Sequence, residues 1–124
     1  MTPMTVLVVE DDESLRRLIV ATLPDDWTPV EAGDGMEAIA LARQHHPDAV
    51  ILDHDLPMLA GADVCEVLRR ETWSSHTCIV ALTGSDDRHV RRRFADAGAD
   101  AFLLKPFSPV QLLDLLDRWE SLRV

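Results

Sequence analysis

Residues 49–57 read AVILDHDLP. The first four residues are apolar without interruption, which is typical of a strand buried on both faces of a parallel sheet. An aspartate, Asp53, follows the apolar run directly, and Pro57 lies in the turn that comes next. Ligands of open parallel sheets bind at the carboxyl ends of the strands. This stretch therefore predicts an α/β fold and puts a candidate functional residue at the edge of its sheet.

Strand and helix patterns alternate on both sides of this stretch. Short apolar or β-branched runs predict five strands, at Thr5–Val9, Thr28–Glu31, Ala49–Leu52, Cys78–Leu82 and Ala101–Leu104. Apolar residues at helical spacing predict a helix after each strand, in residues 15–23, 35–44, 61–71, 90–97 and 109–119. Five strands that alternate with five helices predict a (βα)5 fold with a doubly wound parallel sheet.

Capping signals mark where several of these helices begin and end. Asp34 with Glu37, and Ser108 with Gln111, have the spacing of capping boxes, in which two side chains bond to backbone N–H groups at a helix start. Gly98 is suited to the position just after a helix, where the backbone adopts a left-handed conformation. These signals support the helix boundaries indicated by the apolar pattern.

Composition limits the classes of function. The chain has 124 residues and a formal net charge of -10, which argues against direct binding to nucleic acids and to anionic membranes. The ten predicted elements occupy this length, so we expect a single domain over residues 1–124 and no effector domain in this chain. Neither a membrane span nor a signal peptide is visible, and Cys65 and Cys78 form no CxxC pair. We therefore expect a cytoplasmic protein with reduced cysteines.

Reactive side chains follow four of the predicted strands: Glu10 and Asp11, Asp53 and Asp55, Thr83, and Lys105. Lys105 is also the only lysine, since the other 11 basic residues are arginines. Carboxylates at one edge repel one another, by about 4 kcal/mol per pair at about 4 Å and an effective dielectric of about 20. Such a cluster favours a cation, and carboxylates with open positions suit Mg2+. A lysine and a hydroxyl nearby would bind phosphoryl oxygens, so the set predicts phosphoryl transfer onto an aspartate.

Four motifs in this order resemble the receiver domain of two-component response regulators. They are VVEDD at residues 8–12, ILDHDLPM at 51–58 followed by Gly61, ALTG at 81–84 and KPF at 105–107. The resemblance extends from the first strand to the last helix, so it implies a single receiver domain. It also implies the CheY-like, flavodoxin-like strand order 2-1-3-4-5.

The resemblance implies a role for each acidic residue. Asp53 would be the phosphoacceptor. Asp11, Asp53 and the main-chain carbonyl of Asp55 would bind Mg2+, and Glu10 would act on the ion through water.

The same resemblance implies how the site would work as a switch. Lys105 would contact the phosphoryl group, and its bond to Pro106 is expected to be cis. Thr83 would be the switch hydroxyl and Phe102 the switch aromatic residue. Among the positions that depart from the family pattern, two bear on the switch. Phe102 stands where Tyr is common, which removes a hydroxyl hydrogen bond, and Gly84 stands where Ala is frequent, which still leaves room for the phosphoryl group.

We therefore expect a phosphorylation-dependent signalling switch rather than a conventional enzyme. A sensor histidine kinase or a histidine phosphotransfer protein would supply the phosphoryl group. The new charge would change the face made by the fourth helix, the fifth strand and the fifth helix. That face would contact a downstream protein, an effector domain missing from this chain, or a second copy in a dimer.

Charged residues near this face allow two interpretations. The arginine-rich run at residues 88–93 fits a partner contact and fits a solvated helix face equally well. Arg91, Asp100 and Arg118 resemble the charged dimer contacts of one regulator subfamily. Ala97 and Ala101, however, stand where that subfamily tends to have acids.

Two other functions remain as alternatives. Asp53 and Asp55 form a DxD pair, as in phosphatases of the haloacid dehalogenase type. Pro57 stands where those enzymes usually have Thr or Val, and their pair follows the first strand rather than the third. The second alternative is a receiver-like interaction module that needs no phosphate. The complete set of acids, Thr83 and Lys105 argues against it.

Overall fold

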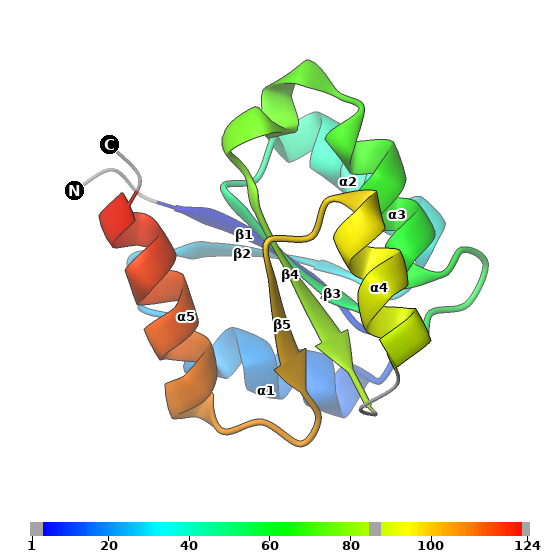
Figure 1. Ribbon diagram of the computed structural model, residues 1–124. Coiled ribbons are helices and arrows are strands. Elements are labelled where there is room, and N and C mark those ends of the chain that lie inside the picture. The colour runs from blue at the N-terminus through cyan, green and yellow to red at the C-terminus, as the bar shows by residue number, and fades with distance from the viewer. Residues whose placement is uncertain (1–3, 85–87, 123–124) are drawn as a thin grey trace.

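The computed structural model describes residues 4–84 and 88–122 (Figure 1). Within these residues, five strands form one sheet: β1 (Thr5–Val9), β2 (Thr28–Ala32), β3 (Ala49–Asp53), β4 (Cys78–Thr83) and β5 (Ala101–Leu104). The α-helices are α1 (Glu13–Thr22), α2 (Gly35–His45), α3 (Gly61–Arg69), α4 (Arg88–Ala97) and α5 (Pro109–Leu122). The strands are parallel and lie in the order β2-β1-β3-β4-β5. The predicted doubly wound (βα)5 fold is confirmed.

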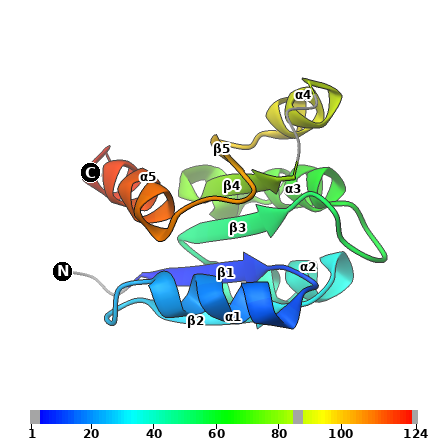
Figure 2. The same ribbon diagram turned by 90° about the horizontal axis from the view of Figure 1, so that it is seen from below.

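Two hydrophobic cores hold the sheet between layers of helices. Because side chains of a strand alternate between its faces, consecutive residues of β1 enter different cores. Val8 packs with residues of α1 and α5, and Val9 packs with residues of α2, α3 and α4. β5 forms one edge of the sheet and lies between α4 and α5 in both views (Figures 1 and 2). No helix in the described part of the chain is both long enough and apolar enough to cross a membrane.

The predicted capping residues act at the helix ends. The Asp34 side chain accepts a hydrogen bond from the N–H of Glu37, whereas Glu37 bonds to the N–H of the residue before Asp34. Ser108 and Gln111 bond to each other's backbone N–H, which is the complete reciprocal arrangement. Gly98 follows α4 with a φ of 101°, as predicted for a helix C-terminus.

A few boundaries differ from the sequence-based expectation. β2, β3 and β4 each extend one residue further, and α3 ends at Arg69, two residues early. A short 3-10 helix, η1 (Thr72–His76), follows α3 and was not predicted. A tertiary contact supports it, since the ring of Trp73 stacks on that of His46 at the end of α2, with ring centroids 4.8 Å apart. Trp27 lies in the loop before β2, yet it is only 6% exposed and belongs to a core.

One arginine, Arg69, forms hydrogen bonds and an ion pair with several segments near the amino ends of β4 and β5. Arg69 donates to the carbonyl oxygens of Gly98 (2.8 Å) and Ser74 (2.7 Å) and forms an ion pair with Asp100. Asp100 also accepts a hydrogen bond from the N–H of Ile79 in β4 (2.7 Å). The C-terminal ends of α3 and α4 are therefore tied to the sheet at the same place.

Candidate functional site

Glu10 and Asp53 lie side by side because β1 and β3 are neighbours in the sheet. Val9 pairs with Leu52, so the residues that follow them reach the same edge. The N–H of Glu10 donates to the carbonyl of Ala32 in β2 (3.1 Å), which keeps Glu10 in line with its strand. Glu10 is 1% exposed and Asp53 is 3% exposed. Two carboxylates are thus almost completely buried at adjacent strand ends.

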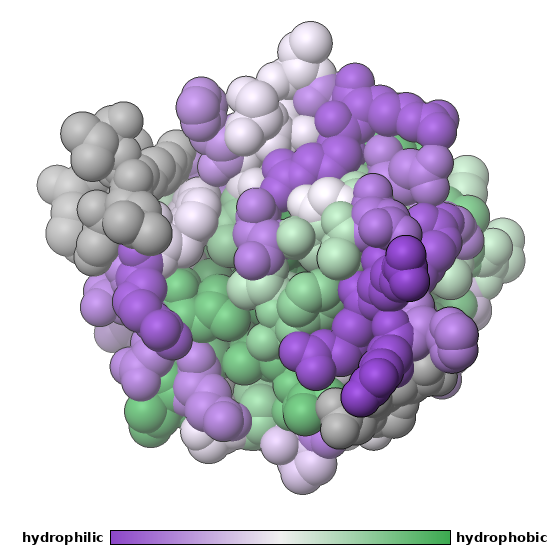
Figure 3. Space-filling model, viewed as in Figure 1, coloured by the Kyte–Doolittle hydropathy of each residue, from purple (hydrophilic) through white to green (hydrophobic). Residues whose placement is uncertain are grey.

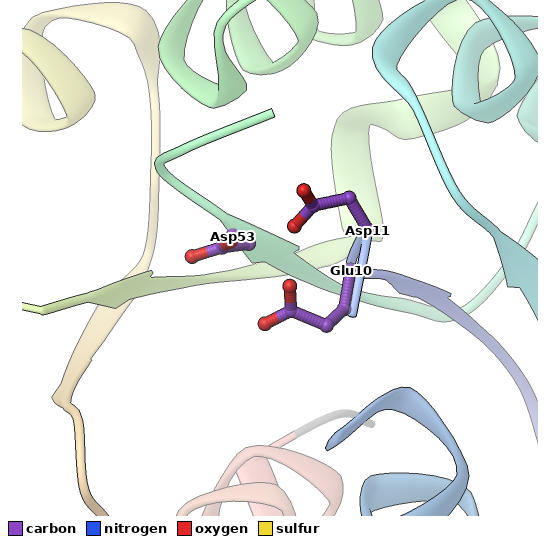
Figure 4. A group of neighbouring side chains, drawn as sticks. All are labelled: Glu10, Asp11 and Asp53. Atoms are coloured by element: carbon purple, nitrogen blue, oxygen red, sulfur yellow. The ribbon is translucent and has the colours of Figure 1, made fainter. Parts of the chain in front are cut away.

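Asp11 adds a third carboxylate to this pair. Carboxylate oxygens of Glu10, Asp11 and Asp53 all lie within 4.8 Å of one another, and Figure 4 shows them converging from the ends of β1 and β3. Asp11 is exposed, so the cluster is open to solvent on one side. Mutual repulsion and an all-oxygen donor set favour the binding of a hard cation such as Mg2+.

Lys105 brings a positive charge to the cluster. Its Nζ lies 2.7 Å from Oε1 of Glu10 and 2.9 Å from Oδ1 of Asp53. Its N–H donates to the carbonyl of Thr83 (2.7 Å), and its bond to Pro106 is cis, as predicted. Burial by itself would lower the pKa of Lys105, but the hydrogen bonds to Glu10 and Asp53 outweigh it, and the pKa is raised. The ammonium charge is therefore retained at neutral pH.

The environment of Glu10 makes its charge costly. Burial raises the pKa of Glu10, and the hydrogen bond from Lys105 only partly opposes this effect. The nearby charge of Asp53 raises the pKa further. A cation bound among the carboxylates would reduce this cost.

The buried hydroxyl of Thr83 has no hydrogen-bond partner within the described residues. Thr83 is 1% exposed and ends β4, which is paired with β3 at Asp53. Buried polar atoms nearly always have a partner, so this hydroxyl is suited to a ligand that enters the site. The next residue, Gly84, adds no bulk at this edge, and a β-carbon built there would meet no atom of the described residues within 4 Å.

Two other predicted residues lie outside the carboxylate cluster. Asp55 is exposed, and its carboxylate is not among the three that come together in the described part of the chain. Metal binding by its main-chain carbonyl stays a prediction. Phe102 is half-buried on β5, where its ring packs edge-on against Phe94 of α4 at a centroid distance of 6.4 Å. The phenyl ring therefore connects β5 with α4 rather than with the carboxylates.

Two residues that shape the site were not explained by the sequence. Arg16 donates to the carbonyl oxygen of Glu10 (2.9 Å) and pairs with Glu31 (3.0 Å), so it fixes the backbone of the acid pair. A basic residue one turn into the helix after that pair is the signal that could have identified it. Gly61 was noted as part of the motif that follows the third strand, and the structure shows that a glycine is needed there for a steric reason. A β-carbon there would lie 2.1 Å from the carbonyl oxygen of Asp53.

Comparison with known domains identifies the family. A model of the response regulator receiver domain matches residues 6–117. The chain belongs to this family.

The receiver domain is 40% identical over 112 residues to the response regulator MprA of Mycobacterium sp. (strain KMS). This alignment covers 90% of this chain and 48% of that protein. It is 40% identical over 107 residues to the probable transcriptional regulatory protein TcrX of Mycobacterium tuberculosis, with coverages of 86% and 45%. The chain spans about half the length of the curated relatives it matches.

Solved receiver domains have the same architecture. The chemotaxis response regulator CheY4 of Vibrio cholerae superposes with a TM-score of 0.88 at 32% identity, covering 95% of this chain and 99% of that one. The receiver domain of the sensor histidine kinase PA1611 of Pseudomonas aeruginosa, which has a magnesium ion in its active-site cleft, gives 0.86 at 28% identity, with coverages of 95% and 98%. Family membership favours the receiver interpretation over the phosphatase alternative.

Proposed function

We propose that this receiver domain is a phosphorylation-dependent signalling switch in which Asp53 accepts a phosphoryl group from phosphohistidine. The observation that carries the proposal is the buried Asp53 carboxylate bound by Lys105 at 2.9 Å, at the edge where the Thr83 hydroxyl has no partner within the described residues. Receiver domains of response regulators receive phosphoryl groups from kinases, which supports this assignment. The donor is a sensor histidine kinase or a histidine phosphotransfer protein.

The transfer exchanges one phosphorus bond for another. A carboxylate oxygen of Asp53 attacks the phosphorus of the donor's phosphoimidazole, and the P–O bond forms as the P–N bond breaks. Protonation of the second ring nitrogen lets the donor leave as neutral imidazole, which keeps the electron pair of the P–N bond. The charge of Lys105 stabilises the oxygens of the transferring group, and the Thr83 hydroxyl donates to one of them.

The donor set of this site fits Mg2+. Asp11 supplies a carboxylate oxygen on the solvent-exposed side of the cluster, and the buried Asp53 supplies another. We propose that these two residues and the main-chain carbonyl of Asp55 hold the ion, and that Glu10 acts through water. The bound ion would neutralise part of the negative charge on the transferring phosphoryl group.

The phosphoryl group acts as a switch through Thr83 and Phe102. A dianionic group on Asp53 provides the partner that the Thr83 hydroxyl needs, so the hydroxyl turns toward it. Phe102 then moves into the space that the threonine leaves. This movement changes the face formed by α4, β5 and α5. The added charge on Asp53 thereby alters a surface that lies away from the phosphorylation site.

The face formed by α4, β5 and α5 is the output surface in this proposal. Asp100 is bound by Arg69, and Arg118 donates to the carbonyl of Asp114, so two residues that resembled dimer contacts bond within the chain. We therefore favour a downstream protein or an effector domain as the partner, and the dimer is the alternative. The net charge of -10 argues against direct nucleic-acid binding by this domain.

The thiols fit a reducing compartment. Cys65 and Cys78 are both free and buried. Burial raises the pKa of Cys65 to about 11 and that of Cys78 to about 12, so both remain protonated and unreactive at neutral pH. We place the domain in the cytoplasm.

An apolar groove beside the site is suited to the phosphodonor. It has a volume of about 350 Å³ between α1 and the segment after β5, and its lining includes Leu15, Leu18, Phe107 and the stem of Lys105. A donor must bring its phosphohistidine to Asp53, and the groove shares Lys105 with that site. Leu18 is 60% exposed and available for contact. We assign this groove to the histidine-bearing segment of the donor protein.

Replacement of Leu18 by Glu is expected to slow phosphotransfer from a histidine kinase that modifies the wild-type domain. Loss of an apolar anchor and burial of a charge would reduce the rate by at least about tenfold. Phosphorylation by acetyl phosphate would stay within about twofold of wild type, because this small donor needs no groove. Met36→Glu is the control, since Met36 is a 56% exposed apolar residue on α2. Equal losses with both donors would contradict the docking assignment.

The proposed function itself is tested with the wild-type chain. Incubation with acetyl phosphate and Mg2+ is expected to add the mass of one phosphoryl group, and chelation of the metal is expected to prevent this. Sustained turnover of a phosphate monoester would support the phosphatase alternative instead. An unchanged mass at saturating acetyl phosphate would support the phosphate-independent module.

A further inference from the structure

The phenyl ring of Phe102 is in contact with a cation on α4. The guanidinium carbon of Arg91 lies 5.5 Å from the centroid of this ring, within the range of a cation–π interaction. We infer that Arg91 is a positioning residue that holds Phe102 in its unphosphorylated position and thereby sets how readily the switch responds. The inference rests on the proposed function of Asp53, because it concerns the movement that phosphorylation causes.

Phe102 and Thr83 point toward the same face of the sheet. Phe102 pairs with Ala81 in the register of β4 and β5, and paired residues project to the same side. Thr83 comes two residues after Ala81 on the same strand, so its side chain projects to that side as well. A ring that turns toward the buried hydroxyl can therefore remain on its own face of the sheet.

The contacts of Phe102 divide between the interior and the surface. On the inner side it meets the edge of Phe94, which is fully buried and also packs against His54, the residue after Asp53. On the outer side it meets Arg91, which is exposed. A ring that moves inward leaves the surface where the guanidinium lies, and the cation–π contact is lost. The contact therefore favours the outward position and opposes the switch.

Linkage turns this contact into an effect on ligand binding. A cation–π contact near the surface contributes about 0.5–1 kcal/mol, and its loss would accompany inward movement of the ring. A phosphoryl analogue that favours the inward position must overcome this free energy. Removing the contact is therefore expected to tighten binding of the analogue by about two- to fivefold.

The same contact couples the switch to the charge of the output surface. Figure 3 shows apolar residues across the middle of this face, bordered by hydrophilic residues on both sides. The exposed guanidinium of Arg91 lies over the Phe102 ring of β5. Inward movement of Phe102 would remove the ring from beneath the guanidinium, so the surroundings of this surface cation change as the site is phosphorylated.

The experiment is a double-mutant cycle that measures the affinity for beryllium fluoride, a phosphoryl analogue, in the presence of Mg2+ by calorimetry. Arg91→Gln is expected to tighten binding by about two- to fivefold in the wild-type background and to have no effect in the Phe102→Leu background. Arg91→Lys, which keeps a cation, is expected to bind nearly as wild type does. Arg92→Gln is the matched control, because it removes the same charge from an exposed neighbour on α4.

The outcomes separate this inference from the proposed function. If Arg91→Gln and Arg92→Gln bind the analogue alike, or if Arg91→Gln has the same effect with Phe102 as with Leu at that position, the positioning role of Arg91 is wrong. The proposed function would be unaffected in either case. If the wild-type domain does not bind beryllium fluoride with Mg2+, the proposed function fails and this inference fails with it.

Discussion

Replacement of Asp53 by Asn is expected to reduce phosphoryl incorporation from acetyl phosphate and Mg2+ to below detection. The amide nitrogen and oxygen of Asn cannot replace the carboxylate as a nucleophile, and the proposed metal site loses one negative charge at the same time. The phosphoryl group would otherwise reside on this buried side chain, 2.9 Å from Nζ of Lys105. Intact mass and phosphate release at neutral pH would measure the change.

The fold is expected to survive this replacement. Asn has nearly the size of Asp, and Lys105 keeps its 2.7 Å contact with Glu10. Removing one of three clustered carboxylates also relieves repulsion, so thermal stability without Mg2+ is not expected to fall. Asp26→Asn is the control, because Asp26 is exposed and lies just before β2, at the opposite edge of the sheet. Equal incorporation by Asp53→Asn and the wild type would show that another residue is modified.

Replacement of Gly61 by Ala is expected to destabilise the domain and to slow phosphorylation. The new methyl group would lie 2.1 Å from the carbonyl oxygen of Asp53 and 2.9 Å from Cζ of Phe94. The first contact is with backbone, so β3 or the start of α3 must move. Overpacking of this kind costs about 1–3 kcal/mol in the free energy of unfolding, which urea denaturation would measure.

Gly84→Ala provides a matched comparison at the same edge of the sheet. Among the described residues, no atom lies within 4 Å of a β-carbon at Gly84, so this change is expected to alter the free energy of unfolding by less than about 0.5 kcal/mol. Phosphorylation by acetyl phosphate would remain close to wild type. Similar stabilities of the two alanine variants would contradict the steric role of Gly61.

The sequence allows much of the fold to be predicted because the strands are continuous apolar runs separated by strong helix signals. The carboxylate site follows from the same pattern. Glu10, Asp53, Thr83 and Lys105 each come at the end of a strand, and parallel strands bring their carboxyl ends to one edge. The family resemblance then supplies roles that position alone does not give.

Features that depend on tertiary contacts could not be predicted in this way. η1 forms where Trp73 stacks on His46, and Trp27 is buried although its loop looks polar. The contact between Arg91 and Phe102 joins a helix to a strand, and neither residue's local pattern indicates which side chain will cover the ring. Arg16 illustrates the same limit, because its partner is the carbonyl oxygen of Glu10 rather than a side chain.

The contacts of Arg69 have a mechanical consequence for α4. They tie the carboxyl end of this helix, through Gly98 and Asp100, to α3 and β4. A helix held at one end can tilt about that end with little loss of contact there. Arg93 also pairs with Asp63 and Glu66 of α3, so the middle of α4 is held as well. We therefore expect any displacement of α4 that begins near Phe102 to be largest toward Arg88, at the end nearest the carboxyl edge of the sheet.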